Sequence, residues 1–176
     1  MGIERKYDLG AIEKGLNAFP ERVERALVNT LRYAGEQCVN EARSLPSPSA
    51  ADFPDYPKIP PHQPNYIDWT KNLRSSIGYV VVVDGQVVSG QDSFKAEQGG
   101  EEGARKGLEF AMETVERYKT GIVLILVAGM HYAAYVQSKG YDVLNSAVIK
   151  AEEIVPSLLK QLEGLIQEEY ESYFNG

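Results

Sequence analysis

Cysteine and histidine, which build many reactive and metal-binding centres, are scarce in this chain of 176 residues. It has one cysteine, Cys38, and two histidines, His62 and His131. A single cysteine excludes an internal disulfide and a thiolate zinc cage. The spacings of a nucleophile elbow, a zinc-binding histidine pair and a glycine-rich cofactor turn are also missing. We therefore expect no metal and no cofactor.

Positive charge is in short supply as well. The chain has 18 Lys and Arg against 25 Asp and Glu, a net charge of −7, so a basic face for nucleic acid is not expected. Its longest aliphatic run, 122–128, is much shorter than the roughly 20 residues that cross a bilayer. The first residues lack the apolar segment of a signal peptide. We expect no membrane partner and a cytoplasmic location.

Helical periodicity dominates both ends of the chain. Apolar residues recur at helical spacing over 8–18, 21–43 and 104–118, and from 142 to the C-terminus. Pro20 is expected to begin a new helix, and Pro156 predicts a kink or break near 153–155. Cys38 falls on the apolar stripe of its helix, which predicts an inert core thiol. The last helix carries most of the acidic excess.

Three strands are predicted in the middle of the chain. Residues 77–83 and 86–89 flank Asp84-Gly85, a dipeptide typical of a two-residue type I′ hairpin turn. A third strand covers 121–128. The fold class is therefore α+β, with a small antiparallel or mixed sheet packed against a long N-terminal helix, a middle helix and a kinked C-terminal helix. We expect one domain, 1–176.

The predicted sheet is apolar on both faces. One face carries Val80 and Val82 together with Val123, Ile125 and Val127. Leaving five such aliphatics exposed would forgo on the order of 10 kcal/mol, comparable to the stability of a domain. Either a helix covers each face or another copy of the chain does. We predict that a copy completes at least one face or edge, with Val80 and Val82 in the interface.

Two segments outside the predicted helices and strands are distinctive. Residues 44–65 hold seven prolines with Phe53, Tyr56 and Ile59 between them. This composition predicts an extended arm that lies across a surface, its own or a neighbour's. Polar, glycine-bearing residues at 90–103 predict a flexible loop. The aromatic residues that end the chain, Tyr170, Tyr173 and Phe174, suit a contact with another chain, so we assign them and the arm aromatics to an assembly interface.

Two stretches resemble a known family. Residues 68–77 read DWTKNLRSSI and precede a hairpin with a DG turn, and residues 128–144 read AGMHYAAYVQSKGYDVL. In this order they resemble the motifs of the tail-component family of tailed phages, the siphophage head–tail joining or tail completion proteins. The matching structural positions are Thr70, Leu73, Arg74, Ser76, Ile77, Tyr132, Tyr135 and Gly140.

This resemblance implies a non-catalytic structural protein of a phage or prophage. Such a protein forms a homo-oligomeric ring where the portal, the connector and the tail tube meet. Its partners would be its own copies and the phage connector and tail proteins, in the cytoplasm during assembly and then in the virion. Two alternatives stay open: a cytoplasmic adaptor whose proline-rich arm binds a partner, and a small-molecule enzyme using His131 with Tyr132 or Tyr135.

Overall fold

The structure is a computed structural model that describes residues 9–44, 66 and 68–175, with side chains between 17 and 172 of these ranges. The described elements, in chain order, are α1 (Leu9–Ser44), α2 (Asn72–Ser75), β1 (Ile77–Val83), β2 (Gln86–Ser89), η2 (Gln91–Ser93), α3 (Glu101–Val115), β3 (Ile122–Ala128), α4 (Ala133–Ser138) and α5 (Asn145–Asn175). The α+β class is confirmed.

The described sheet has the strand order β2-β1-β3, and both pairings are antiparallel. The predicted hairpin is confirmed, because β1 and β2 have the expected bounds. Asp84 and Gly85 between them have φ values of 47° and 82°, the positive values that a type I′ turn needs. Opposite β2, β1 pairs along its whole length with β3, from Ile77 opposite Ala128 to Val83 opposite Ile122.

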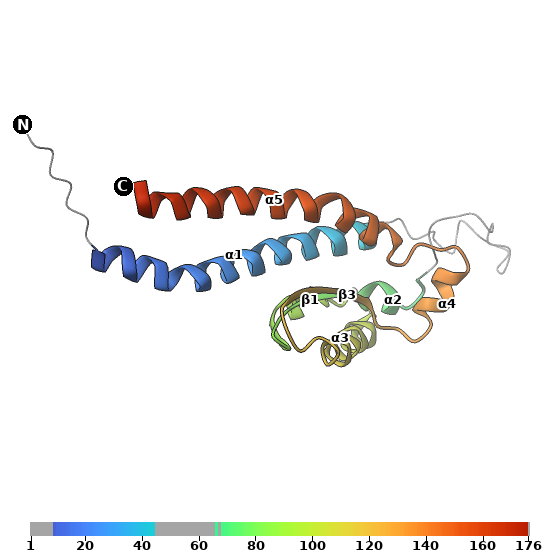
Figure 1. Cartoon of the computed structure of the whole chain (residues 1–176). Coiled ribbons are helices and arrows are strands. Elements are labelled where there is room, and N and C mark those ends of the chain that lie inside the picture. Colours follow the sequence, from blue (N-terminus) through green and yellow to red (C-terminus); the bar gives the residue numbers. More distant parts are fainter. Residues whose placement is uncertain (1–8, 45–65, 67, 176) are drawn as a thin grey trace, which may run out of the picture.

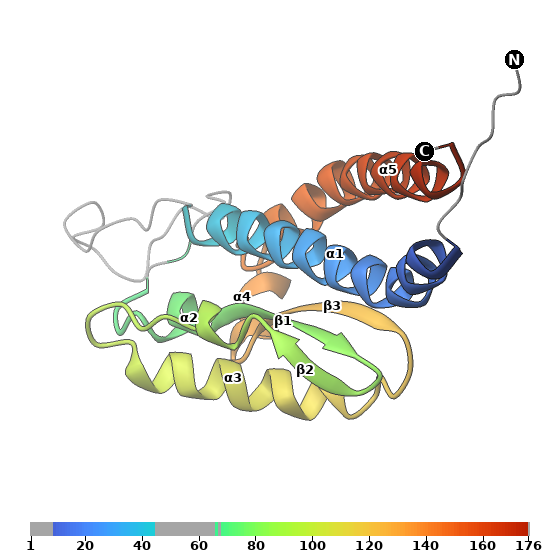
Figure 2. The same ribbon diagram turned by 90° about the vertical axis from the view of Figure 1, so that its left-hand side faces the viewer.

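Helices of the same chain cover both faces of this sheet (Figure 1, Figure 2). Tyr79 and Val81 pack with Cys38 of α1 on one side. On the other side, Val80 and Val82 pack against α3 and are completely buried. The prediction that Val80 and Val82 form an assembly interface is therefore wrong. The middle helix, α3, covers the face that was expected to be covered by a second copy of the chain.

Glycine allows the α3 layer to come close to the end of the sheet. A Cβ atom placed on Gly129, directly after β3, would lie 2.5 Å from the Cα atom of Gly107 in α3. Real Cβ atoms do not approach other carbon atoms so closely, so any side chain at Gly129 would push helix and strand apart. This contact also fixes the relative height of α3 and β3.

α1 and α5 lie antiparallel beside each other, and one end of the pair extends past the sheet (Figure 1). α1 continues through Pro20 and α5 through Pro156. The prediction that a new helix begins at Pro20 is wrong, and α5 is not broken at Pro156. Both prolines are exposed. Each lacks a backbone N–H, and the packing of the two helices against each other offsets the free-energy cost of the missing hydrogen bond.

Hydrogen bonds tie the segment 90–103 to the rest of the fold. The Ser93 hydroxyl accepts the Tyr79 N–H at 2.8 Å and donates to the Tyr79 carbonyl at 3.0 Å. The Glu97 N–H donates to the Ser75 hydroxyl at 3.0 Å. Ser93 thus takes the place of a further strand residue beside β1, and α3 begins at Glu101, three residues earlier than expected.

The core contacts of β1 predict a large loss of folding stability when its first residue, Ile77, is truncated. Ile77 is fully buried between β1 and α1, so we expect Ile77→Ala to lower the free energy of unfolding by about 2–5 kcal/mol. Val88→Ala on β2, where the side chain is half exposed, should cost less than about 1 kcal/mol. Urea unfolding followed by circular dichroism measures both, and equal losses would contradict this account of the core.

Candidate assembly surface

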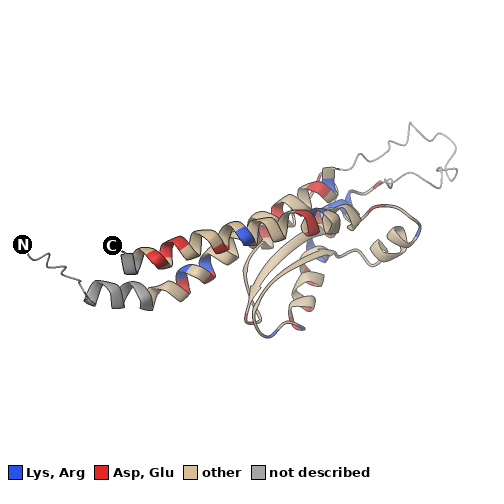
Figure 3. Ribbon diagram, turned by 45° about the horizontal axis from the view of Figure 1, so that its top comes forward, with Lys and Arg blue, Asp and Glu red and all other residues tan. Residues whose placement is uncertain are grey.

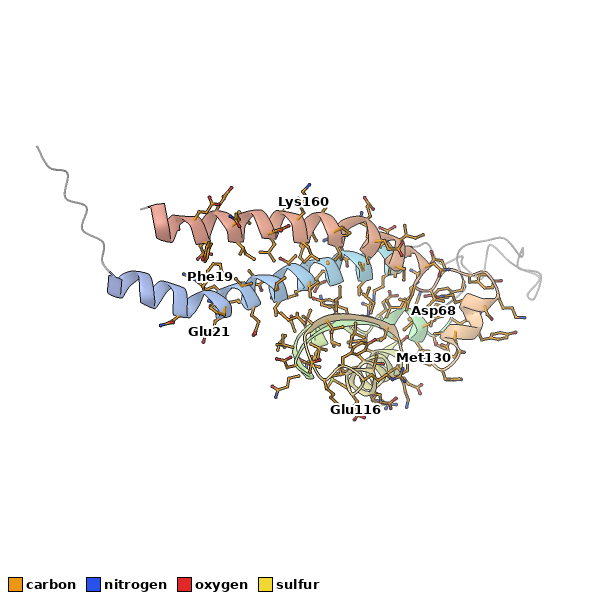
Figure 4. The ribbon with its side chains drawn as sticks, viewed as in Figure 1. Phe19, Glu21, Asp68, Glu116, Met130 and Lys160 are labelled. Carbon is orange, nitrogen blue, oxygen red and sulfur yellow. The ribbon has the colours of Figure 1, made fainter. Side chains whose placement is uncertain are left out.

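The two stretches that carry the family resemblance meet at one end of the sheet. Figure 4 labels Asp68, before α2, and Met130, after β3, on this side of the molecule. The buried Asp68 carboxylate accepts the Arg74 N–H at 2.8 Å. Tyr132 follows Met130 by two residues and lies near Asp68. Burial, and then the negative charge of Asp68, raise the pKa of the Tyr132 phenol. Residues 68–77 and 128–144 thus form one structural unit.

Two arginines join this unit to the end of α1. The Arg43 guanidinium donates to the carbonyl of Ile77 at 2.5 Å and to that of Ser75 at 3.3 Å. In return, the Arg74 guanidinium donates to the Arg43 carbonyl at 3.1 Å. These charged donors occupy carbonyls that the helix end and the strand start would otherwise leave without a partner. Arg74 therefore holds α1 against the sheet.

The remaining motif positions have structural roles of the same kind. Ser76 donates to the Leu73 carbonyl at 2.7 Å, and the Leu73 side chain is buried. Thr70 accepts the N–H of Asn72 at 3.3 Å, although the residue at the N-cap of α2 is Lys71 and not Thr70. Gly140 follows α4 with a φ of 87°, the left-handed conformation in which glycine commonly ends a helix.

Tyr135 is the exposed aromatic residue among the motif positions, with 64% of its surface accessible. The ammonium group of Lys139 lies 5.1 Å from the centre of its ring. No buried contact of the fold requires an aromatic ring at this position on α4. Tyr135 is therefore available to another molecule.

A second surface of interest is formed by the N-terminal part of α1 and the C-terminal part of α5, residues 17–33 and 158–172, here called the helical projection; its far end extends past the sheet (Figure 1). The Phe19 and Tyr170 rings lie 5.7 Å apart between the helices, and Arg22 pairs with Glu169 at 3.2 Å. Figure 4 labels Phe19 on the side of α1 that faces α5. Several large apolar side chains of the projection are nevertheless exposed: Tyr33, Leu159, Leu165 and Tyr170.

The predicted interface residues have different outcomes. Tyr170 is exposed on the projection, and its assignment to an interface stays a prediction. Phe53, Tyr56 and Ile59 lie outside the described residues, as do His62 and the side chains of Tyr173 and Phe174. Val80 and Val82 are core residues, as corrected above. The interface assignment therefore depends on the projection and not on a face of the sheet.

The sequence did not reveal a groove of about 920 Å³ beside the end of β3. Its walls come from α3, the end of β3, α4 and the start of α5, and its lining includes Glu109, Phe110, Glu113, Leu126, His131 and Leu144. Finding it required the strand order, which places β3 at an edge of the sheet. The only sequence signal was a strand without a single polar residue.

The ionisable groups of this groove do not form an acid–base pair. The His131 ring makes an edge-on contact with Tyr132 at 5.1 Å. Glu109 bonds to Lys106 and Arg105, and these cations lower the pKa of its carboxyl.

Cys38 lies in the core and outside this groove. Burial raises the pKa of its thiol, as expected for a core cysteine. The prediction that the chain is not an enzyme stays a prediction.

The described residues contain no group of three or more histidine, cysteine or acidic side chains that could hold a metal ion. Within the part of the chain that the structure describes, every helix is too short or too polar to cross a membrane.

Comparisons with family models, curated proteins and solved structures found no match to this chain. The phage-tail assignment is therefore carried by the resemblance of 68–77 and 128–144 alone, and it stays a prediction.

The buried phenol of Tyr66 predicts a loss of stability at alkaline pH. Burial, assisted by the Asp68 carboxylate, raises its pKa above the ordinary value, although the Arg74 guanidinium lies 6.0 Å from its ring. The unfolded chain releases this proton near pH 10, whereas the folded chain retains it. Stability should therefore fall as the pH rises above about 10.

Thermal unfolding between pH 8 and 11 tests this expectation. Tyr66→Phe should reduce the alkaline loss, because the group that ionises on unfolding is gone. Tyr135→Phe is the matched control: its phenol is exposed, so it should leave the pH dependence as it is in the wild type. A Tyr66→Phe curve that parallels the wild type would contradict the assignment.

Proposed function

We propose that this protein is a structural component of a phage or prophage, which acts at head–tail joining or tail completion by assembling into a ring of its own copies. The phage origin rests on the resemblance of 68–77 and 128–144, and the observation that supports assembly is the helical projection. One end of its helix pair extends past the sheet (Figure 1), and the projection keeps Leu159, Leu165 and Tyr33 exposed. A protein that works alone gains nothing from apolar side chains displayed on a projection.

The shape of the projection supports a contact between different surfaces of neighbouring copies. A shallow groove of about 280 Å³ runs between the helices and is lined by Tyr33, Leu158, Leu162 and Leu165. Such a groove accepts the ridge of a further helix, as in helix bundles. Repeated head-to-tail, a contact of this kind closes into a ring.

The charges of the two helices favour the same arrangement. Acidic residues gather toward the C-terminal part of α5 (Figure 3), among them Glu163 and Glu168. On α1 the exposed cations include Arg25 and Arg32. An acidic α5 placed against α1 of the next copy meets these cations. Excess negative charge elsewhere on the ring repels phosphates, which suits a channel through which DNA passes.

This function implies further partners in addition to the copies in the ring. The faces of the ring would meet the phage connector on one side and tail proteins on the other. The protein would be in the cytoplasm during assembly and in the virion afterwards. Portal, capsid or tail-tube genes beside its own gene are the expected genomic context, and neighbours of another kind would count against a phage origin.

Assembly is tested with the purified full-length chain at micromolar concentration. Light scattering after size exclusion should give a mass several times that of the 19.5 kDa chain, and negative-stain microscopy should show rings. Leu165→Lys should lower the ring fraction at least about tenfold, because the contact would bury an unpaired charge.

Gln167→Lys provides the matched control. It adds the same charge to an exposed position of α5 that does not line the groove, so rings should persist. A wild-type chain without rings, or rings that tolerate Leu165→Lys, would contradict the proposal.

A further inference from the structure

The outer edge of β3 presents unpaired backbone groups. The Asp84 N–H donates to the Gly121 carbonyl and the Gly129 N–H donates to the Ser76 carbonyl. Bonded pairs alternate along an antiparallel ladder, so Val123, Ile125 and Val127 bond to β1. The N–H and C=O groups of Ile122, Leu124, Leu126 and Ala128 point outward, where no strand of the described chain pairs with them.

The two edges of the sheet are protected differently. β2 has four residues, begins with the exposed Gln86, and pairs with β1 through a register shift at Val81/Val82. Short length and irregular pairing are known ways to prevent unwanted strand pairing. β3 has seven aliphatic residues, and its pairing with β1 is regular throughout. Charge, proline and bulge are all missing from it, so this edge is suited to pairing.

We propose that β3 pairs antiparallel with β3 of a second copy of this chain, about a two-fold axis at Ile125, to form a continuous six-stranded sheet. In this register Leu124 lies opposite Leu126 of the partner subunit, and Ile122 lies opposite Ala128 of the partner subunit. All the outward groups named above are then used, in about eight hydrogen bonds.

The position of α3 fits this pairing. Ala111 and Val115 of α3 pack against Val80 of β1 and Ile125 of β3, so the helix axis lies between these two strands. Strands are about 4.8 Å apart, which places each helix axis about 4.8 Å from the two-fold axis. The two α3 helices are then about 10 Å apart, the ordinary distance between packed helices.

Charges on α3 are complementary under the same two-fold axis. Lys106, Phe110 and Glu113 line the groove beside β3, and Arg117 continues their helical spacing in the turn after α3. Gly107 and Gly129 are in contact, so they lie at the same level along α3 and β3. The helix rises about 1.5 Å per residue and the strand about 3.3 Å per residue. Counted from this contact, Glu113 lies level with Leu126, and Arg117 lies near Leu124. Glu113 therefore faces Arg117 of the partner subunit, twice in each dimer.

The groove leaves room for the partner. β3 contributes only Leu126, Val127 and Ala128 to its lining, so α4 and the start of α5 overhang the C-terminal half of the strand. Antiparallel pairing brings the N-terminal half of the partner's β3 to this place, and among the described residues that half does not line the groove. The inference rests on β3 and α3, not on the helical projection, and it does not require a phage origin.

Charge reversal at the two-fold axis tests the pairing. Glu113 and Arg117 are both exposed, so substitution should leave the fold intact. In sedimentation equilibrium of the full chain, Glu113→Arg should weaken dimerisation at least about tenfold, because two cations then meet. The double variant Glu113→Arg, Arg117→Glu should restore it. Glu116→Arg, an equal charge change at an exposed position outside the groove lining, should dimerise like the wild type.

Cross-linking gives a second measurement that also works inside a larger assembly. Glu113→Cys and Arg117→Cys chains are mixed, allowed to exchange subunits and treated with a short bis-maleimide, while the buried Cys38 stays unreactive. The mixture should give more covalent dimer than either chain alone, because the two different cysteines lie level with each other across the two-fold axis. A monomeric wild type, rings without the mixed cross-link, equal effects of Glu113→Arg and Glu116→Arg, or a double variant that stays weakened would each overturn the proposal.

Discussion

The rest of the structure depends on the enclosure of β1. This strand is apolar along its length, and in the described sheet it has neighbours on both sides. Its Tyr79 faces α1 and its Val80 faces α3, and both are completely buried. Two helices that are distant in sequence must therefore meet the same strand, one on each face. Gly35 of α1 lies beneath the Tyr79 ring, where a larger side chain would lift the helix off the sheet.

The arginine contacts at the start of β1 explain why the family-like motif is structural. Arg43 and Arg74 exchange hydrogen bonds with backbone carbonyls across the junction of α1, α2 and β1. Tyr132 approaches the same junction from the other stretch of the motif. A resemblance that resides in such a junction indicates a shared way of packing helices on a hairpin. It bears on function only through the surfaces that this packing leaves exposed.

Local signals predicted more of this fold than long-range ones. The hairpin and β3 follow from neighbouring residues, and the structure confirms them. The face that carries Val80 was misjudged because its cover, α3, comes some thirty residues later in the sequence. The effect of Pro20 was misjudged because packing against α5 outweighs a local helix breaker. The groove beside β3 could not be predicted, since nothing local encodes strand order.

Because helices cover both faces of the sheet, assembly must use other surfaces. The two candidates, the helical projection and the edge of β3, expose different kinds of groups. The helical projection exposes side chains such as Leu165 that any apolar surface of suitable shape can cover. The edge of β3 exposes backbone groups, which only another strand can satisfy along its whole length. Such an edge selects its partner by direction and register, and Glu113 and Arg117 add a charge pattern that matches its own two-fold image. Self-recognition through the edge is thus more specific than contact through the projection, although the projection displays the larger apolar side chains.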